Sequence, residues 1–386
     1  MIYSMEQEKE RMILVGVSEG NQMDAYASLK ELEELAETAG AEVASKILQN
    51  REGIHPATYV GKGKLEEIRQ LLYHLEADGV ICDDELTPAQ MKNLEEELSC
   101  KIVDRTLLIL DIFASRARTS EGKLQVEMAQ LKYRQARLVG LRGSLSGLGG
   151  GIGTRGPGEK KLEMDRRLIS SRIAALRKEL EEVRQHRDVL REGREKGNFR
   201  TAAIVGYTNA GKSTLLNVLT GAEVLEEDAL FATLDPTTRL LDLPGGGEIL
   251  LTDTVGFIRR SASSPQMEEQ MHVVYETLRE LGAEGKPVVT LFNKQDKLEA
   301  EKSCKDLQAD YSLRISAKTG QGLEEFRAVL EKILLEQQIY VERLYPYSEA
   351  GKIALIRRRG RLVSEEYLAE GIQVKAYVPK EIYGKI

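Results

Sequence analysis

The sequence contains few cysteines and few histidines, and both scarcities narrow its chemistry. The three cysteines, Cys82, Cys100 and Cys304, lie far apart and form no C-x-x-C pair, which argues against a disulfide framework and a zinc ribbon. The four histidines show no H-E-x-x-H motif and no other metal spacing. No apolar run is long enough to cross a bilayer, and the first residues show no signal-peptide pattern. We therefore expect a cytoplasmic protein with reduced thiols and no membrane span.

Charge is unevenly distributed along the 386 residues, a length that accommodates two to four domains. The net charge is −7, yet residues 116–200 carry 21 Lys and Arg against 11 Asp and Glu. Such a basic segment is typical of a protein with a polyanionic partner. A solvated helix face with ion pairs four residues apart explains the same composition, and charge alone leaves both interpretations open.

Short apolar runs alternate with amphipathic stretches through residues 12–103. This alternation predicts an α/β domain at residues 1–115 with a mostly parallel sheet. Thr87 before Pro88 predicts a helix start with Thr87 as its N-cap. The stretch Gly61-Lys-Gly-Lys64 lies between a predicted strand and a predicted helix, where phosphate can bind, but it lacks the rest of any nucleotide motif. A plain strand-to-helix turn is the favoured interpretation.

The pattern of apolar residues and glycines in residues 116–197 predicts a helical hairpin. Apolar stripes indicate one helix from Gly122 to Leu138 and a second from about Glu159 to Glu195. The glycine-rich residues 141–158 between them lose too much backbone entropy to form a packed element. A flexible basic tip suits insertion into folded RNA, and an interdomain linker is the alternative. The predicted RNA-binding residues of this tip are Arg142, Arg155, Lys160 and Lys161.

The rest of the chain is organised around a P-loop. Residues 201–205 read as a buried strand that runs directly into G-x-x-x-x-G-K-S at residues 206–213, followed by an apolar helix. In this motif backbone N–H groups surround the β- and γ-phosphates, Lys212 reaches them, and Ser213 holds Mg²⁺. The helix N-terminus adds a favourable dipole for the phosphates.

Two motifs that respond to the γ-phosphate follow in the expected order. Residues 230–239 supply threonines for a switch that closes over Mg²⁺, with Thr233 as the candidate and Thr237 as the fallback. A predicted strand then delivers the D-x-x-G motif, in which Asp253 contacts the Mg²⁺ shell and the Gly256 N–H senses the γ-phosphate. We predict catalytic roles for Lys212, Thr233 and Gly256, and metal binding by Ser213, Thr233 and Asp253.

The base-reading motif N-K-x-D covers residues 293–296 at the end of another predicted strand. The carboxylate of Asp296 accepts two hydrogen bonds from the edge that guanine has and adenine lacks, which argues against an ATPase or a kinase. Residues 316–318 complete the set after a further strand. The predicted GTP-binding residues are Gly206, Tyr207, Thr208, Asn209, Ala210, Gly211, Lys212, Ser213, Thr214, Phe231, Ala232, Thr233, Leu234, Asp235, Asp253, Thr254, Val255, Gly256, Asn293, Lys294, Asp296, Ser316, Ala317 and Lys318.

These motifs assign residues 198–336 to a P-loop GTPase domain and leave residues 337–386 as a small α+β domain with two or three strands. The final segment contains a basic cluster at residues 357–361. Its arginines either contact RNA or have no binding role, and the sequence leaves both interpretations open.

Several longer strings are specific to one family. They are YVGKGK at 59–64, DRT at 104–106, IFASRA at 112–117, GGGIGTRGPGE at 149–159, FATLDPT at 231–237, and EEY with GIQV at 365–374. With these strings the whole chain resembles the HflX family of ribosome-associated GTPases.

The resemblance implies an N-terminal α/β domain joined through a pair of long helices to a GTPase domain that uses GTP, GDP and Mg²⁺. It also implies binding to the large (50S) ribosomal subunit and its rRNA, with the glycine-rich loop near the peptidyl-transferase region. The GTP-bound form is then expected to split stalled or vacant ribosomes. We expect a cytoplasmic, partly ribosome-associated monomer.

Phe257 follows the D-x-x-G motif, where many GTPases have a glutamine that orients the attacking water. Phenylalanine can neither donate nor accept a hydrogen bond. We therefore expect slow intrinsic hydrolysis, with a partner such as rRNA organising the water and the γ-phosphate.

The chain departs from the family between Gly256 and Asn293. Only 36 residues separate them, with one helix-like stretch and one strand, whereas a GTPase sheet needs two crossovers here. If the strand before Asn293 slides beside the P-loop strand, the N-K-x-D motif moves by about 4.8 Å, which is one strand spacing. Its side chains would then lie beyond hydrogen-bond distance of guanine. If the gap stays open, the sheet carries unpaired edges. Either outcome predicts impaired nucleotide binding and hydrolysis, and leaves a nucleotide-independent ribosome- or RNA-binding protein as the alternative function.

Overall fold

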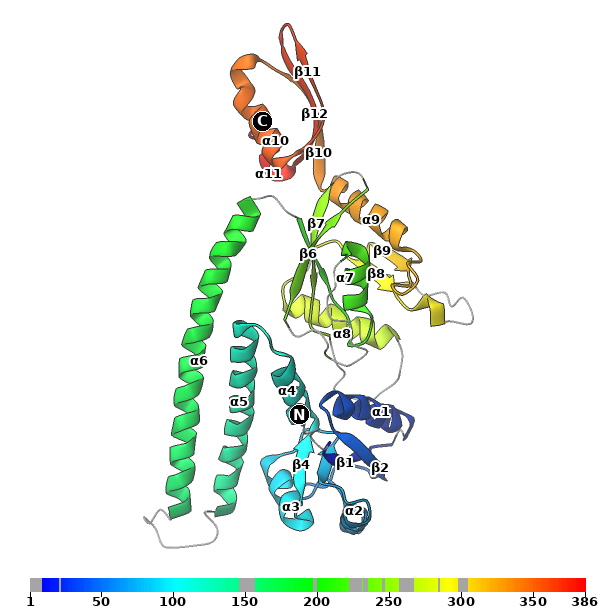
Figure 1. The fold of residues 1–386 in the computed structure, drawn as a ribbon, viewed down its shortest axis with the longest axis vertical. Coiled ribbons are helices and arrows are strands. Elements are labelled where there is room, and N and C mark those ends of the chain that lie inside the picture. The colour runs from blue at the N-terminus through cyan, green and yellow to red at the C-terminus, as the bar shows by residue number, and fades with distance from the viewer. Residues whose placement is uncertain are drawn as a thin grey trace, which may run out of the picture.

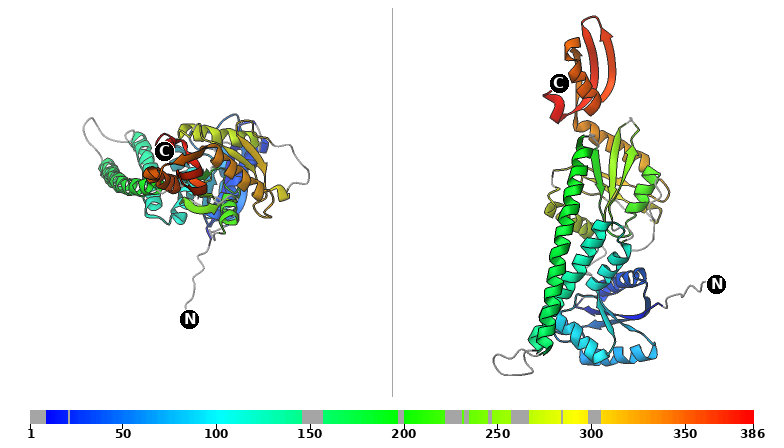
Figure 2. Two further views of the ribbon diagram at one scale, coloured as in Figure 1. Left: turned by 90° about the horizontal axis from the view of Figure 1, so that it is seen from above. Right: turned by 60° about the vertical axis from the view of Figure 1, so that its left-hand side comes forward.

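The computed structural model describes residues 9–20, 22–145, 157–196, 200–221, 231, 235–244, 247–256, 267–283, 285–297 and 305–386. The molecule is elongated, with the N-terminal sheet toward one end and the last strands at the other (Figure 1). Helix α6 (Pro157–Lys196) runs along one side, from the level of the N-terminal sheet to the level of the nucleotide-binding part (Figures 1 and 2). In the described part of the chain, no helix is both long enough and apolar enough to cross a membrane.

The N-terminal part is a mixed α/β unit around four parallel strands in the order β2-β1-β3-β4. The strands are β1 (Arg11–Ser18), β2 (Glu42–Asn50), β3 (Gly79–Cys82) and β4 (Lys101–Asp104). The helices are α1 (Gln22–Thr38), α2 (Lys62–His74), α3 (Pro88–Leu98) and α4 (Arg105–Arg116). The Thr87 side chain accepts the Gln90 backbone N–H in a capping box at the start of α3, where the sequence predicts a helix start.

Central strand β1 contributes to two apolar cores. Ile13 and Val15 pack with residues of α2 and α3 on one face, while Met12 and Leu14 pack with residues of α1 and α4 on the other. Side chains alternate across a strand, so a strand buried on both faces reads as a continuous apolar run. The run at residues 12–15 has this pattern, and all four side chains are buried.

Two helices follow, α5 (Ser120–Leu145) and α6, which lie side by side, and α6 continues beyond the start of α5 (Figures 1 and 2). Buried apolar residues come from both, including Val126 of α5 and Leu176 of α6. The predicted boundaries were wrong at the tip. α5 continues past Leu138 to Leu145, and α6 starts at Pro157, a residue whose fixed φ suits the first turn of a helix. Residues 146–156 of the predicted glycine-rich loop lie outside the described residues.

The nucleotide-binding part has two sheets where the sequence predicts one. Strands β5 (Arg200–Ile204), β7 (Glu248–Asp253) and β6 (Thr237–Asp242) pair in the order β5-β7-β6. Strands β8 (Val289–Phe292) and β9 (Tyr311–Arg314) form a separate parallel pair. The helices are α7 (Lys212–Thr220), α8 (Met267–Glu280), the short η1 (Gln295–Lys297) and α9 (Leu323–Glu336).

Both sheets share one core through α7 and α9. Leu215 and Leu216 of α7 and Phe326 of α9 belong to an apolar cluster to which β5 and β8 also contribute. Yet no ladder joins β5 to β8 among the described residues. Of the two arrangements predicted for the shortened stretch, the structure has the open gap.

The C-terminal part consists of three antiparallel strands in the order β10-β12-β11 with helices on one side (Figure 2). The elements are β10 (Gln338–Tyr345), η2 (Tyr347–Glu349), α10 (Ala350–Arg359), β11 (Arg361–Leu368), β12 (Gly371–Pro379) and α11 (Lys380–Tyr383). Two arginines of the basic cluster are engaged in ion pairs: Arg357 with Glu365, and Arg361 with Glu331 of α9 at 3.3 Å. These pairs give both side chains a structural role.

Candidate nucleotide-binding site

The P-loop connects β5 to α7 and has the backbone that phosphate binding requires. Gly206 and Gly211 have φ values of +156° and +87°, and Asn209 has a left-handed φ of +55°. Gly211 is the N-cap of α7, so the following N–H groups lie at the positive end of the helix. A side chain at residue 211 would also collide with Asn293, because its Cβ would lie 2.4 Å from Nδ2.

Lys212 lies inside this loop. Its Nζ donates a hydrogen bond to the carbonyl oxygen of Tyr207 at 2.6 Å. Burial lowers the pKa of Lys212, and the negative charge of Asp253 acts in the opposite direction. A desolvated ammonium group binds phosphate more strongly than one in water, because less of its charge is screened.

Ser213 and Asp253 lie together beneath the loop. The Ser213 hydroxyl donates to Oδ2 of Asp253 at 2.7 Å, and Asp253 is completely buried at the end of β7. Thr254 fixes this end to β5 by donating from Oγ1 to the carbonyl oxygen of Ile204 at 2.7 Å. A hydroxyl and a carboxylate are the oxygen ligands that Mg²⁺ prefers, so these residues fit the predicted metal.

The described residues contain no group of three or more His, Cys, Asp or Glu side chains arranged to hold a metal by themselves. Mg²⁺ in nucleotide sites is held by one or two protein groups together with phosphate oxygens and water. Ser213 and Asp253 are two such protein groups, so this arrangement fits a metal ion that binds together with the nucleotide.

The D-x-x-G motif reaches the P-loop at Gly256. A Cβ at residue 256 would lie 2.8 Å from both the backbone N and the Cα of Thr208, so only glycine fits without displacing backbone. Gly256 is therefore adjacent to the P-loop, near the place where its N–H is predicted to sense the γ-phosphate. Residues 232–234, including Thr233, lie outside the described residues. The fallback Thr237 is the first residue of β6, opposite Asp253 in the ladder.

The base-reading motif meets the P-loop despite the gap in the sheet. The Asn293 amide donates to the carbonyl oxygen of Ala210 at 2.9 Å, and its Oδ1 accepts the Ala317 N–H at 2.9 Å. Lys294, which has a left-handed φ of +65°, donates to Oδ1 of Asn209 at 3.3 Å. Asn293 and Lys294 thus both join the base-reading motif to the P-loop.

Asp296 is exposed, and its Oδ1 accepts a hydrogen bond from the Ser316 hydroxyl at 2.7 Å. This hydrogen bond is the main cause that lowers the pKa of Asp296, with the positive charges of Lys318 and Lys297 adding to it. An ionised carboxylate accepts hydrogen bonds only, which is the role required for reading guanine. Ser316 and Ala317 are buried behind it, and Lys318 is exposed.

Two residues predicted to bind GTP have their side chains at the N-terminal domain instead. Phe231 is buried against Phe113 of α4, with ring centroids 4.7 Å apart in an edge-to-face arrangement. Oδ2 of Asp235 accepts the backbone N–H groups of Arg118 and Thr119, both at 2.8 Å. Burial alone would raise the pKa of Asp235, but the hydrogen bonds from Thr119 and Arg118 outweigh it and lower this pKa.

The predicted RNA-binding residues are only partly placed. Arg142 belongs to α5, and Lys160 and Lys161 belong to the beginning of α6, but their side chains lie outside the described residues. Arg155 lies outside them altogether.

Sequence reasoning missed a polar cluster where α5 joins the N-terminal sheet. Asp104, completely buried at the end of β4, accepts hydrogen bonds from the Tyr133 hydroxyl at 2.6 Å and from Arg137 at 2.5 Å. Arg137 stacks on the Tyr133 ring, 3.2 Å from its centroid. The detectable signal is the spacing of Tyr133 and Arg137, which puts both on one face of a helix.

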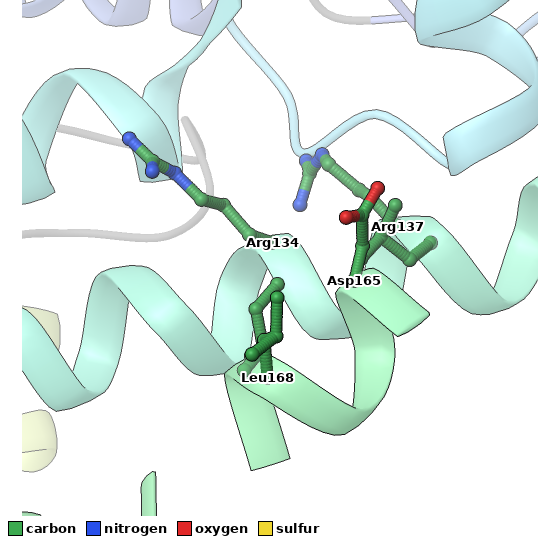
Figure 3. Close-up of a pocket in the computed structure, with 6 residues that line it drawn as sticks. Arg134, Arg137, Asp165 and Leu168 are labelled. Carbon is green, nitrogen blue, oxygen red and sulfur yellow. The ribbon is translucent and has the colours of Figure 1, made fainter. Parts of the chain in front are cut away.

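A cavity of about 480 Å³ adjoins this cluster between α5 and α6 (Figure 3). It is lined by Arg134, Arg137, Leu138, Asp165, Leu168 and Ile169. Leu168 is 64% exposed, so the cavity opens widely to solvent.

Comparison with known proteins identifies the family of this chain. A protein named GTPase HflX from Lacrimispora saccharolytica is 59% identical over 404 aligned positions, which cover 98% of this chain and 96% of the relative. Another GTPase HflX, from Caldanaerobacter subterraneus subsp. tengcongensis, is 48% identical over 97% of this chain and 92% of the relative. The chain belongs to the HflX family of GTPases.

Three family descriptions divide the HflX chain. Residues 26–114 match "GTP-binding GTPase N-terminal", residues 116–194 match "GTP-binding GTPase Middle Region", and residues 201–313 match "50S ribosome-binding GTPase". Among solved structures, a GTP-binding protein from Sulfolobus solfataricus in complex with GDP is 24% identical, with a TM-score of 0.43 over 84% of this chain and 98% of that chain.

The alignments also measure what this HflX chain lacks. The alignment with the Lacrimispora relative has 404 positions. It includes 98% of the 386 residues of this chain, which is about 378 residues. About 26 positions are therefore occupied only in the relative. The same reasoning gives about 27 for the Caldanaerobacter relative, whose alignment has 401 positions and covers 97% of this chain. A helix and a strand with their connections have about this length.

Proposed function

We propose that this HflX chain binds GTP and GDP with Mg²⁺ and hydrolyses GTP to GDP and phosphate. The observation that carries the proposal is the pair of hydrogen bonds by which Asn293 joins Ala210 of the P-loop to Ala317. Phosphate-binding and guanine-reading elements thereby face one site, although their strands belong to separate sheets.

In the proposed reaction Lys212 stabilises the negative charge that develops on the β- and γ-phosphates. Ser213, Asp253 and Thr233 would hold Mg²⁺, and the metal ion would supply positive charge that neutralises the charge developing on the phosphates. The Gly256 N–H would respond to the γ-phosphate, and Asp296 would accept the two N–H donors of guanine. Intrinsic hydrolysis is slow because Phe257 cannot orient water.

Calorimetry with GTP, GDP and ATP tests the nucleotide proposal. We expect both guanine nucleotides to bind and ATP to bind at least about a hundredfold more weakly, because Asp296 would leave its hydrogen bonds unmade. Lys212→Ala should weaken all binding, whereas Asp296→Ala should remove the preference for guanine. Lys286→Ala, which removes an exposed lysine of the same domain outside the nucleotide motifs, is the control. Equal affinity for ATP and GTP would contradict the proposed base reading.

We further propose that the chain binds the large (50S) ribosomal subunit and its rRNA through residues 1–115 and the hairpin at 116–197, and that the GTP form splits stalled or vacant ribosomes. The basic balance of residues 116–200 supports an RNA partner. The cavity between α5 and α6 lies beside Arg134 and Arg137 in the same segment (Figure 3). We propose a monomer that acts in the cytoplasm and is partly ribosome-associated.

A second candidate function is favoured by the split sheet. Because β5 and β8 share no neighbouring strand in the part of the chain that the structure describes, the GTPase domain is less well supported than a complete one, and the chain would then bind ribosomes without nucleotide control. Co-sedimentation with ribosomes in the presence of a GTP analogue, GDP or no nucleotide separates the two functions. Association that depends on the analogue and is lost in Lys212→Ala supports the GTPase; unchanged association in all conditions supports the alternative.

A further inference from the structure

The helix α5 begins with an incomplete capping box. Its N-cap is Thr119, whose hydroxyl accepts the Gly122 N–H at 3.0 Å. In a complete box the third helical residue is Glu or Gln, whose side chain accepts the N–H of the N-cap residue. Here the third helical residue is Gly122, which has no side chain.

A residue from the nucleotide-binding part supplies the missing carboxylate. Oδ2 of Asp235 accepts the Thr119 N–H at 2.8 Å, although the two residues are 116 positions apart. The same oxygen accepts the Arg118 N–H at 2.8 Å, and Oδ1 accepts the Thr119 hydroxyl at 2.5 Å. A Cβ at residue 122 would lie 2.4 Å from Oδ1, so the glycine is what admits Asp235.

Phe231 makes a second attachment on the same side. Its side chain is 4% exposed and belongs to the apolar cluster of α1, α4 and β1. Its φ is +56°, a conformation that bulky residues adopt only when their surroundings impose it. Burial of the aromatic ring in another domain provides that constraint.

The D-x-x-G motif joins the same cluster. Val255, which precedes Gly256, packs against the cluster that contains Phe231 and Phe113. Phe231 and Val255 therefore contact the apolar cluster that includes α4, and Asp235 contacts the residues just before α5. Asp235 lies two residues before Thr237, the described candidate for the switch threonine, so at most about 7 Å of chain separates this anchor from it.

We propose that the junction of α4 and α5 positions the switch for the γ-phosphate, with Asp235 and Phe231 as positioning residues and Gly122 as the receptor for Asp235. This inference rests on the proposed nucleotide site. These contacts would then strengthen the binding of GTP but not that of GDP. GDP lacks the γ-phosphate that the switch must reach.

Gly122→Glu separates capping from positioning in the full-length protein. The introduced carboxylate completes the capping box of α5 from within the helix and occupies the space of Asp235. We expect α5 to stay folded while the affinity for a GTP analogue falls about tenfold and the affinity for GDP changes less than twofold. Asp235→Ala should give the same split, and Asp235→Asn should largely restore binding, because an asparagine oxygen still accepts an N–H.

Hydrogen exchange without nucleotide provides the second measurement. We expect faster exchange in residues 235–242 of Gly122→Glu, with unchanged protection in the later turns of α5. Unchanged exchange there would overturn the docking, and unchanged or increased affinity for the GTP analogue would overturn the positioning role. If the parent protein binds neither nucleotide, the proposed function fails, and the exchange result alone decides whether Asp235 holds this loop.

Discussion

The two α/β parts of the molecule differ in how completely neighbouring elements cover their strands. In the N-terminal sheet, β3 is buried at all four residues and has a strand on each side. In the nucleotide-binding part, β5 alternates between half-buried and exposed residues, and among the described residues it pairs with β7 alone. Burial therefore comes from neighbouring elements, because both strands have small or apolar side chains throughout most of their length.

The nucleotide site keeps its contacts although no strand joins β5 to β8 among the described residues. The P-loop still has its left-handed glycine, and Asn293 still bridges the loop to Ala317. These contacts lie at the carboxyl ends of strands, where loops rather than ladders hold the groups together. The site geometry is thus less sensitive to the gap than the sheet is.

Completing the sheet should have the largest effect. The variant inserts between residues 256 and 267 a designed helix and strand of about 26 residues, the number of positions that the Lacrimispora alignment has beyond this chain, to give β5 and β8 a common neighbour. We expect the free energy of unfolding of the nucleotide-binding part to rise by about 3 kcal/mol or more, because several apolar side chains become buried. Urea unfolding followed by a probe in that part measures the change. An insert of equal length rich in glycine and serine is the control, and an equal gain from it would contradict the explanation.

Chemical labelling compares the two sheets directly. Cys82 ends β3 with 1% exposure, and burial raises the pKa of its thiol, whereas Ala203 in the middle of β5 is exposed. In a background with Cys100 and Cys304 changed to serine, Ala203→Cys should react with a maleimide at least about a hundredfold faster than Cys82. Equally slow labelling would show that another segment covers this face of β5.

A matched pair of valine substitutions should have a smaller effect. Val80 of β3 is 1% exposed, while Val289 of β8 is only half-buried. Val80→Ala should lower the free energy of unfolding of its domain by about 2 kcal/mol, and Val289→Ala by about 1 kcal/mol or less, because less apolar area is lost. Separate urea transitions for the two parts measure both values. A larger loss for Val289→Ala would mean that β8 is better packed than its exposure indicates.

The pH dependence of the Asp235 contact should give the smallest effect. Because its pKa is lowered in the folded state, its stabilisation is present above the unfolded pKa of about 3.9 and is lost as the pH falls through the lower folded pKa. The melting temperature of the wild type should therefore exceed that of Asp235→Ala at pH 5, and this difference should shrink as the pH falls below about 4. A difference that does not change with pH would contradict the role of the ionised carboxylate.

Local patterns predicted much of the fold. The apolar run at residues 12–15, the Thr87 N-cap and the P-loop spacing each depend on neighbours close in sequence, and the structure has the corresponding elements. The shortage of residues between Gly256 and Asn293 predicted a missing crossover, but it left open whether the next strand slides beside the P-loop strand or a gap remains.

Long-range contacts were beyond sequence reasoning. Phe231 and Asp235 belong to a switch motif, and nothing in that motif indicates that their side chains reach α4 and α5. The end of α5 was missed for a related reason: glycines at 140 and 143 argue against a helix locally, but the helix continues to Leu145.

The contact of Asp235 with Thr119 imposes an order on biosynthesis. The carboxylate that completes the capping box of α5 lies 116 residues downstream of Thr119, so α5 is translated well before Asp235. During that interval the Thr119 hydroxyl can already accept the Gly122 N–H, while water takes the place of Asp235 as the acceptor for the Thr119 N–H. The contact between α5 and the nucleotide-binding part therefore forms only after synthesis has passed the middle of the message.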